Sequence, residues 1–256
     1  MSSGMVPVRQ FGLDVEVYET REKMGQAAAD AVAQVICCLL EKKESIRLVF
    51  AAAPSQNEFL KHLMTHDEID FSRIDAFHMD EYVGLSEDAP QGFGNFLRKH
   101  LFNLVDFRSV HYLNGNAADI QAECVRYAAL LAQKEIDVVC MGIGENGHIA
   151  FNDPHVAQLD DPQDVKLVQL DEICRMQQVH DGCFERLEQV PQYALTLTVP
   201  RLCRAGYHFC IVPTSAKAEA VHSAIYGAVE MQCPASVLRI CKNARMFLEN
   251  DSAVFI

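Results

Sequence analysis

Runs of apolar residues alternate along this chain with segments whose apolar residues recur at helical spacing. Residues 13–19 alternate in polarity, which is typical of an edge strand, whereas residues 136–141 are apolar throughout most of their length, as in a buried strand of a parallel sheet. By these patterns, strands are predicted at residues 13–19, 47–52, 74–78, 110–113, 136–141, 194–199, 207–212 and 245–248.

Helices are predicted between most of these strands. The first covers residues 21–41, because Thr20 is a suitable N-cap and Glu22 places an acidic group in the first turn. Residues 153–165 are rich in Asp, Pro and Gln and are predicted to form a loop. The other helices are expected after the loop 53–56 to about residue 64, at residues 91–102, at residues 116–133, from Thr214 or Ser215 to about residue 226, and in a short turn beginning at Pro234.

The alternation of strands and helices predicts a mainly parallel sheet covered by helices on both faces. No internal repeat or linker interrupts it, so one domain is the simpler expectation. Ligands of such sheets bind outside the carboxyl ends of the strands. Three polar segments follow predicted strands and are therefore expected along one edge of the sheet: residues 53–56, Asp80-Glu81 and residues 142–153.

Composition narrows the class of partner. The formal net charge of -13 disfavours a nucleic-acid partner, although an anionic small substrate needs only a local cationic pocket. No run approaches the roughly 20 apolar residues of a membrane span, and residues 1–10 lack the apolar region of a secretory signal. The ten cysteines include no CxxC pair, which favours reduced thiols in a cytosolic protein over a zinc ribbon.

The most informative segment is GIGENGHIAFNDP, residues 142–154, which follows a predicted buried strand. Glycines at that position permit a tight turn and close approach of the backbone to a ligand. His148 and Asp153 lie in this one loop beside Asn146, and a histidine near a carboxylate can act as an acid/base pair. The alternative is an ordinary turn between a strand and a loop.

A second candidate site is the acidic pair Asp80 and Glu81, directly after the strand predicted at residues 74–78. Its functional interpretation is a carboxylate base at the edge of a cleft, with a pKa set by burial and by neighbouring charges. The alternative is a solvated strand end or a helix cap.

Candidate anion ligands lie in three other places. Ser55 and Gln56 precede a helix, so their backbone N–H groups could bind an anion, although Ser55 could equally be a simple N-cap. Lys217 lies in the first turn of a predicted helix, where a cation opposes the helix dipole, and this favours anion binding over a surface lysine. Arg239 ends the segment PASVLR and could reach an anion, or could be a surface arginine at a helix end.

Four segments together resemble the glucosamine-6-phosphate deaminase/isomerase family: FHMDEYVGL (77–85), NGNAADIQAEC (114–124), GIGENGHIAFNDP (142–154) and VPQYALTLTV (190–199). The resemblance extends from about residue 49 to about residue 251. The related 6-phosphogluconolactonases share the fold, but their equivalent loop usually reads DGHxASLFP. Phe151-Asn152-Asp153 is more similar to the deaminase branch.

The resemblance implies a single domain over residues 10–256 with a three-layer α/β/α, Rossmann-like fold. It also implies a cofactor-free conversion of glucosamine 6-phosphate to fructose 6-phosphate and ammonia in amino-sugar catabolism. Residue by residue, it implies that Asp80 is the general base and His148 the ring-opening histidine, with Asp153 (usually glutamate in the family) and Asn146 (often aspartate) in its relay. It also implies phosphate binding by Lys217 and by the loop that contains Ser55. The residues predicted to bind the substrate or its phosphate are Ser55, Gln56, Lys217, Arg239, Glu81 and Gly147.

The chain departs from the family pattern at the phosphate site. The common PTGGTP loop appears as AAAPSQ, and the usual phosphate-binding arginine has no clear match. Asp181 aligns near its place, and Arg239 is the predicted replacement. The alternatives are therefore a galactosamine-6-phosphate deaminase, a lactonase-like hydrolase that uses His148 as the base for water, and a catalytically weak sugar-phosphate sensor.

Further expectations concern partners and location. No metal is required by this chemistry, and no ligand spacing suggests one. The remaining histidines are expected to be surface or packing residues. The protein is expected to be cytoplasmic and to bind a small sugar phosphate rather than nucleic acid or membrane. Both a monomer and a homo-oligomer are compatible with the sequence.

Overall fold

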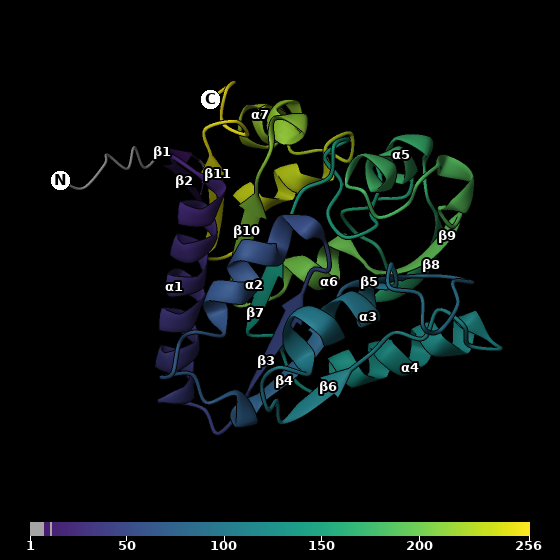
Figure 1. The fold of residues 1–256 in the computed structure, drawn as a ribbon, viewed down its shortest axis with the longest axis horizontal. Helices are drawn as coiled ribbons and strands as arrows, with labels where there is room; N and C mark the ends of the chain where they lie inside the picture. The colour runs from purple at the N-terminus through teal and green to yellow at the C-terminus, as the bar shows by residue number, and fades with distance from the viewer. Residues whose placement is uncertain (1–7, 11) are drawn as a thin grey trace.

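Two β-sheets organise the chain in the computed structural model, which describes residues 8–10 and 12–256 (Figure 1). The larger sheet has eight strands in the order β1-β2-β11-β10-β7-β3-β4-β6, and the smaller has three in the order β5-β9-β8. The strands are β1 (Val8–Gln10), β2 (Leu13–Tyr18), β3 (Ile46–Phe50), β4 (Ile74–His78), β5 (Asp80–Tyr82), β6 (Ser109–His111), β7 (Val138–Met141), β8 (Val165–Gln169), β9 (Tyr193–Leu197), β10 (Tyr207–Val212) and β11 (Ala244–Glu249).

Every neighbouring pair in the large sheet is parallel except β1 with β2, so the prediction of a mainly parallel sheet is confirmed. Consecutive residues of its strands belong alternately to two hydrophobic cores: Leu48 and Phe50 lie in one core and Val49 in the other. This period of two is what a sheet buried on both faces requires.

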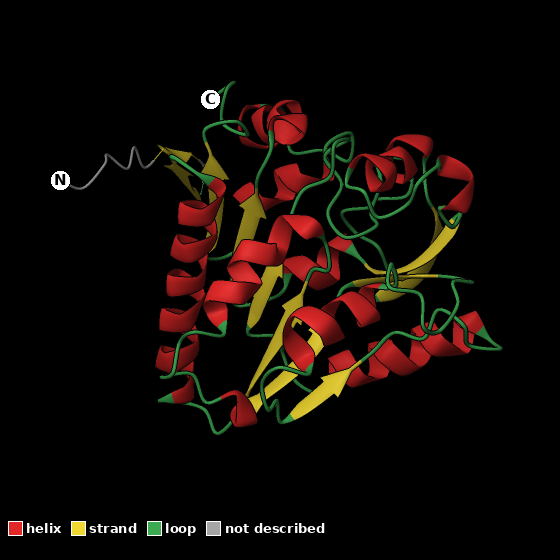
Figure 2. Cartoon of the chain, in the orientation of Figure 1, coloured by secondary structure: helices red, strands yellow, loops and turns green. Residues whose placement is uncertain are grey.

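Helices cover both faces and complete the predicted three layers (Figure 2). The core that contains Leu48 is closed by α1 (Arg21–Leu40), α2 (Asn57–Leu63) and α3 (Phe93–Leu97). The core that contains Val49 is closed by α4 (Ile120–Ala132), α6 (Val199–Cys203) and α7 (Ala218–Tyr226). The first and last residues of the fold lie near each other, where β1, β2 and β11 meet (Figure 1).

Helix α1 begins where the sequence predicts. The Thr20 side chain accepts a hydrogen bond from the Lys23 amide and caps the helix. By length and composition α1 could cross a membrane, but half of its most apolar window is buried against the rest of the protein. A Cβ on Gly25 would lie 2.5 Å from the Glu58 Cβ, so α1 and α2 pack too closely for a larger residue there.

Several helices and strands have other bounds than the sequence predicts, and in two cases a helix N-cap explains the difference. The helix predicted from residue 116 begins at Ile120, because the Asp119 side chain accepts from the Ala122 amide. The strand predicted to residue 199 ends at Leu197, because Thr198 caps α6. The helix predicted at residues 91–102 is the short α3 followed by a π-helical turn, Arg98–Phe102.

Two features were not predicted. Strand β2 is not at the edge of the sheet, because β1 pairs with it in antiparallel fashion. The small sheet is antiparallel throughout, and with it comes helix α5 (Glu172–His180). The small sheet matters for function because its β5 begins at Asp80, which lies opposite Thr196 of β9.

Candidate active site

A pocket opens at the carboxyl ends of β10, β7, β3 and β4, which are adjacent in the large sheet. The three polar segments expected along this edge all contribute to it, together with residues from α5 and from the turn before α7. Its lining comprises Ala51, Ala52, Ala53, Ser55, Gln56, Met79, Asp80, Phe93, Gly142, Ile143, Gly144, His148, Ala150, Phe151, Gln177, Gln178, Asp181 and Lys217.

The backbone at Asp80 is fixed from the large sheet by His78. The His78 Nε2 accepts a hydrogen bond from the Leu113 amide at 2.9 Å, so Nδ1 carries the proton and donates to the Asp80 carbonyl, also at 2.9 Å. Burial lowers the pKa of His78 to about 4, which keeps the ring neutral in this role. His78 was expected to be a packing residue, and it additionally positions Asp80.

The Asp80 carboxyl is buried but lines the pocket. Its Oδ1 is without a hydrogen-bond partner within the described part of the chain. Burial raises the pKa of Asp80 well above its usual value, and the nearby charge of Glu81 raises it further. A carboxylate with a raised pKa and an unused oxygen facing a pocket is suited to take a proton from a bound molecule.

The raised pKa of Asp80 predicts the acid limb of the pH profile. The base must be ionised to accept a proton, so kcat/KM falls as the pH drops through the pKa of Asp80 in the free enzyme. We expect this fall well above the pH of about 4 at which an ordinary aspartate titrates. The measurement is kcat/KM against pH. An acid limb at about pH 4 or below would contradict the buried state of Asp80.

Glycines shape the loop that carries His148. The Gly144 amide donates to the His148 carbonyl at 2.9 Å, and a Cβ on Gly144 would lie 2.1 Å from the imidazole. Gly147 has φ of 80° and packs against Cys233, whose sulfur would be 2.7 Å from an added Cβ. The glycines of the motif therefore leave room for the His148 ring, and Gly147 permits the tight turn that the sequence indicated.

His148, Asn146 and Asp153 form one hydrogen-bonded group. The His148 Nδ1 lies 2.7 Å from the Asn146 Oδ1 and 3.1 Å from the Asp153 Oδ1. The Asn146 Nδ2 donates to Asp153 at 3.0 Å and to Asp171 at 2.9 Å, which fixes the orientation of the amide. Both groups facing Nδ1 are acceptors, so Nδ1 carries the proton and Nε2 keeps a lone pair.

The Asp153 carboxylate is held ionised. Burial acts to raise its pKa, but hydrogen bonds from His148, Asn146 and the Asp171 amide outweigh it and lower the pKa below the usual value. An ionised Asp153 stabilises the protonated imidazole that forms when Nε2 accepts a proton. Asp171, the N-cap of α5, is a member of this group that the sequence did not single out.

Asn146 is expected to act as a positioning residue for His148. Replacing it with alanine removes an acceptor from Nδ1 and a donor from Asp153, so the imidazole loses its fixed orientation. We expect Asn146→Ala to lower kcat about 10-fold or more with little change in KM, which is the scale known for partners that orient metal-bound histidines. Steady-state kinetics would measure this.

Asn116→Ala is a suitable control for that experiment. The Asn116 side chain also donates to a backbone carbonyl, that of Leu85, but lies outside the pocket lining. An Asn146→Ala enzyme as active as the Asn116→Ala enzyme would remove Asn146 from the relay.

Lys217 provides a cation at the other end of the pocket. It ends a short 3-10 turn, Ser215–Lys217, and is the N-cap of α7. The side chain is 4 % exposed, and no described residue accepts a hydrogen bond from its Nζ. Burial lowers the pKa of Lys217, while the charges of Asp181 and Glu145 partly offset this. A buried ammonium facing a pocket is the arrangement expected of an anion ligand.

The loop after β3 lies in the same part of the pocket. Pro54, Ser55 and Gln56 form a 3-10 turn in which Ser55 makes no capping hydrogen bond, so the alternative of a simple N-cap is not observed. The Gln56 Nε2 donates to the Ser55 Oγ at 3.1 Å, and its Oε1 is buried without a partner among the residues described. These polar groups are available to a ligand.

Asp181 also lines the pocket, close enough to influence the pKa of Lys217. Its Oδ2 accepts from the Gln177 Nε2 at 3.3 Å. The structure thus places an acidic residue beside the candidate phosphate-binding lysine, at the position where the resemblance implies an arginine. Gln177 and Gln178 of α5 line the pocket as well and were not singled out from the sequence.

Three predicted binding residues do not line this pocket. The Glu81 carboxylate accepts from the amides of Tyr82, Phe93 and Gly94 and so fixes the start of α3. The Gly147 carbonyl accepts from the Ala235 amide. Arg239 is buried and donates to the Gly227 carbonyl at 2.6 Å. Their contribution to substrate binding stays a prediction.

A parallel α/β sheet with a buried carboxylate, a histidine relay and a buried lysine at the carboxyl ends of its strands defines an acid/base enzyme for a small polar substrate. Residues 19–247 match the family of glucosamine-6-phosphate isomerases/6-phosphogluconolactonase. The chain belongs to this family.

Individual relatives agree with this assignment. A glucosamine-6-phosphate deaminase of Exiguobacterium sibiricum is 35% identical over 189 residues, which are 73% of this chain and 72% of the relative. One of Bacillus thuringiensis is 30% identical over 240 residues, 94% of this chain and 88% of the relative.

Solved structures agree on the fold. A monomeric glucosamine-6-phosphate deaminase superposes with a TM-score of 0.85 at 27% identity, over 94% of this chain and 99% of that one. A 6-phosphogluconolactonase of Thermotoga maritima, 18% identical with a TM-score of 0.76 over 93% of this chain and 100% of that one, shares the fold.

Proposed function

We propose that this protein converts glucosamine 6-phosphate to fructose 6-phosphate and ammonia, without a cofactor, in amino-sugar catabolism. The observation that carries the proposal is the convergence of three groups on one pocket: the Asp80 carboxyl, the His148 relay and the Lys217 ammonium. Among the described residues, neither the Asp80 Oδ1 nor the Lys217 Nζ has a hydrogen-bond partner. The relatives named glucosamine-6-phosphate deaminase support the choice of substrate.

The first step assigned to the site is ring opening. The free Nε2 of His148 takes the proton of the sugar's anomeric hydroxyl and returns it to the ring oxygen as the bond between C1 and that oxygen breaks. The ionised Asp153 stabilises the transient imidazolium through Nδ1. The product of this step is the open-chain aldehyde.

The second step is the transfer of a proton from C2 to C1. The ionised Asp80 removes the C2 proton, and the electron pair forms a C1–C2 double bond while the aldehyde oxygen gains the proton that the C2 ammonium gives up, so that an enolamine forms. Asp80 then returns a proton to C1, which leaves an iminium at C2 that water hydrolyses to the ketone and ammonia. The dry surroundings of Asp80 make it a stronger base than an aspartate in water.

The ammonium group of the bound amino sugar assists this chemistry. A cation placed near Asp80 favours the ionised carboxylate and lowers its pKa from the raised value of the empty pocket. The substrate therefore activates its own base. At the other end, Lys217 and the polar groups of Ser55 and Gln56 receive the phosphate.

The test is ammonia release by the purified protein with glucosamine 6-phosphate, alongside galactosamine 6-phosphate and 6-phosphogluconolactone hydrolysis. We expect release from glucosamine 6-phosphate that is lost in Asp80→Asn. Release from the galacto sugar alone would change the substrate, and lactone hydrolysis alone would replace the reaction. Binding of the sugar phosphates without any turnover would make the protein a sensor.

The same proposal extends to location and assembly. All ten cysteines are free thiols, which suits the reducing cytoplasm. The similar solved structure is named a monomeric glucosamine-6-phosphate deaminase, which supports activity from the monomer, with homo-oligomers as an addition rather than a requirement.

A further inference from the structure

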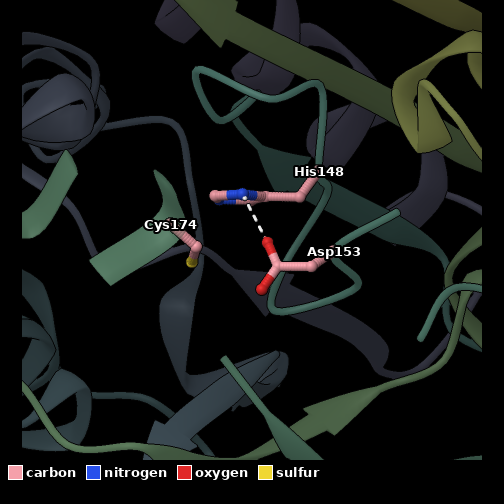
Figure 3. Close-up of side chains that lie close together, drawn as sticks. All are labelled: His148, Asp153 and Cys174. Carbon is pink, nitrogen blue, oxygen red and sulfur yellow. Dashed lines mark ion pairs between the residues drawn. The ribbon is translucent and has the colours of Figure 1, made fainter. Parts of the chain in front are cut away.

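A thiol lies beside the histidine relay. Cys174 of α5, His148 and Asp153 are all buried, and their ligand atoms lie within 4.8 Å of one another. Figure 3 shows the Nδ1 edge of His148 facing the Asp153 carboxylate, with the Cys174 sulfur beside the same carboxylate. The mechanism proposed above uses His148 and Asp153 but gives Cys174 no role.

The three donors fit the preferences of zinc. Imidazole nitrogen, carboxylate oxygen and thiolate sulfur are its usual protein ligands, at about 2.0–2.3 Å, and three protein ligands with one open position are typical of accessible zinc sites. Donor atoms around such an ion lie about 3–4 Å apart. The His148 Nδ1 and Asp153 Oδ1 are 3.1 Å apart and the Cys174 sulfur lies within 4.8 Å of both, so an ion would draw the sulfur closer and replace the contact between Nδ1 and the Asn146 Oδ1.

A second group of possible ligands lies nearby and is the weaker candidate. Asp153, His155 and Asp171 also have donor atoms within 4.8 Å of one another, but His155 is exposed and the group lacks a thiol. The buried group with sulfur is therefore favoured for a borderline-soft ion.

We propose that His148, Asp153 and Cys174 bind a divalent zinc-class ion that holds the site in an inactive form. The ion displaces the Cys174 thiol proton to solvent and takes the Nδ1 lone pair of His148, so the ring proton moves to Nε2. The protons balance, because the Cys174 thiol releases one proton to solvent and Asp153, which is already ionised, releases none.

The inactive form follows from the tautomer. With the proton on Nε2, His148 donates toward the pocket and has no lone pair with which to take the sugar's hydroxyl proton. His148 lines the pocket, so the ion can reach the group by the substrate's own route. This inhibitory consequence rests on the proposed function, whereas the binding of the ion does not.

The test uses Co²⁺ as a spectroscopic substitute for zinc, with the full chain and no substrate. We expect one ion per chain, a thiolate-to-cobalt absorption band in the near ultraviolet, and release of about one proton per ion. Zinc should displace the cobalt. Cys174→Ser should abolish the band and weaken zinc binding by more than about 100-fold, because even an outer partner of a ligand contributes 10–100-fold.

Two matched variants locate the site. Cys38→Ser removes an exposed thiol and should leave the band and the stoichiometry unchanged. His155→Gln removes the competing group and should also leave them unchanged. Cys174→Ala serves as the second variant if the serine enzyme does not fold. A band that survives in Cys174→Ala, or that is lost only in Cys38→Ser or His155→Gln, would overturn the assignment.

Ammonia release then tests the regulation. Zinc should inhibit the unmodified enzyme, and Cys174→Ala should keep its basal activity while requiring more than about 100-fold more zinc for the same inhibition. Inhibition that is equal in both would refute a regulatory role for this group. If the protein binds cobalt as expected but never releases ammonia, the proposed function fails and the metal site stands.

Discussion

Replacing Asp80 with asparagine is expected to lower kcat by about 10³-fold or more, which is the upper part of the range for loss of a general base. The asparagine has nearly the same shape and cannot accept the C2 proton, so KM should change little. Ring opening needs His148 and not Asp80, so the variant should still open the sugar. Steady-state ammonia release measures kcat, and exchange of the C2 proton with solvent deuterium reports the lost step.

Asp137→Asn is the matched control. Asp137 is also a buried aspartate, but it lies just before β7 at the opposite end of the sheet, where it pairs with Lys43 and accepts from the Arg47 amide. We expect this variant to lose stability and to keep its kcat. Equal losses of kcat in the two variants would mean that Asp80 acts through the fold and is not the base.

Asp80→Asn should also stabilise the protein at neutral pH. The folded-state pKa of Asp80 lies above its unfolded value, so between the two the folded chain binds more protons and stability falls as pH rises. Asparagine has no proton to lose. The difference in Tm between Asp80→Asn and the unmodified protein should therefore increase from pH 4 toward neutral pH.

Replacing Lys217 with methionine is expected to lower kcat/KM by about 100-fold, with most of the effect on KM. Removing one partner from a buried pair of opposite charges typically costs 2–5 kcal/mol, and about 2.7 kcal/mol corresponds to 100-fold. Methionine keeps the length of the side chain, and the buried Nζ has no partner within the described chain to lose. The empty protein should therefore be no less stable than before.

Unphosphorylated glucosamine provides the control for that measurement. If Lys217 binds the phosphate, the variant and the unmodified enzyme should handle glucosamine equally poorly. A loss that is the same for both sugars would assign Lys217 to another role. Arg239→Ala, measured in the same way, tests the predicted contribution of Arg239: a rise in KM similar to that of Lys217→Met would place it in phosphate binding.

The sequence predicted the parallel strands of the main sheet and the edge that carries the site, but it did not predict β1. Strands β4 and β10 have the predicted bounds. The small sheet was missed although its strand β9 was predicted, because β5 has only three residues and residue 165, where β8 begins, was placed at the end of a loop. Tertiary pairing with β9, rather than local propensity, makes β8 a strand.

The site was predicted in part for a similar reason. Residues of one loop, such as His148 and Asp153, reveal their proximity through spacing, and the structure joins them. Cys174 reaches the same place from a helix far along the chain, and no spacing rule connects them. Glu81 is the opposite case. Its place in the sequence suggests a role in catalysis or binding, but in the fold its carboxylate accepts hydrogen bonds from backbone amides.

The central position of β7 has a consequence for how the protein acquires its activity. β7 pairs with β3 from the first half of the chain and with β10 from the second, and the pocket lies across these pairings. Contacts so distant in sequence are slow to form and assemble late in folding. Ammonia production during refolding would therefore report the last events of the process, after most helical signal has returned.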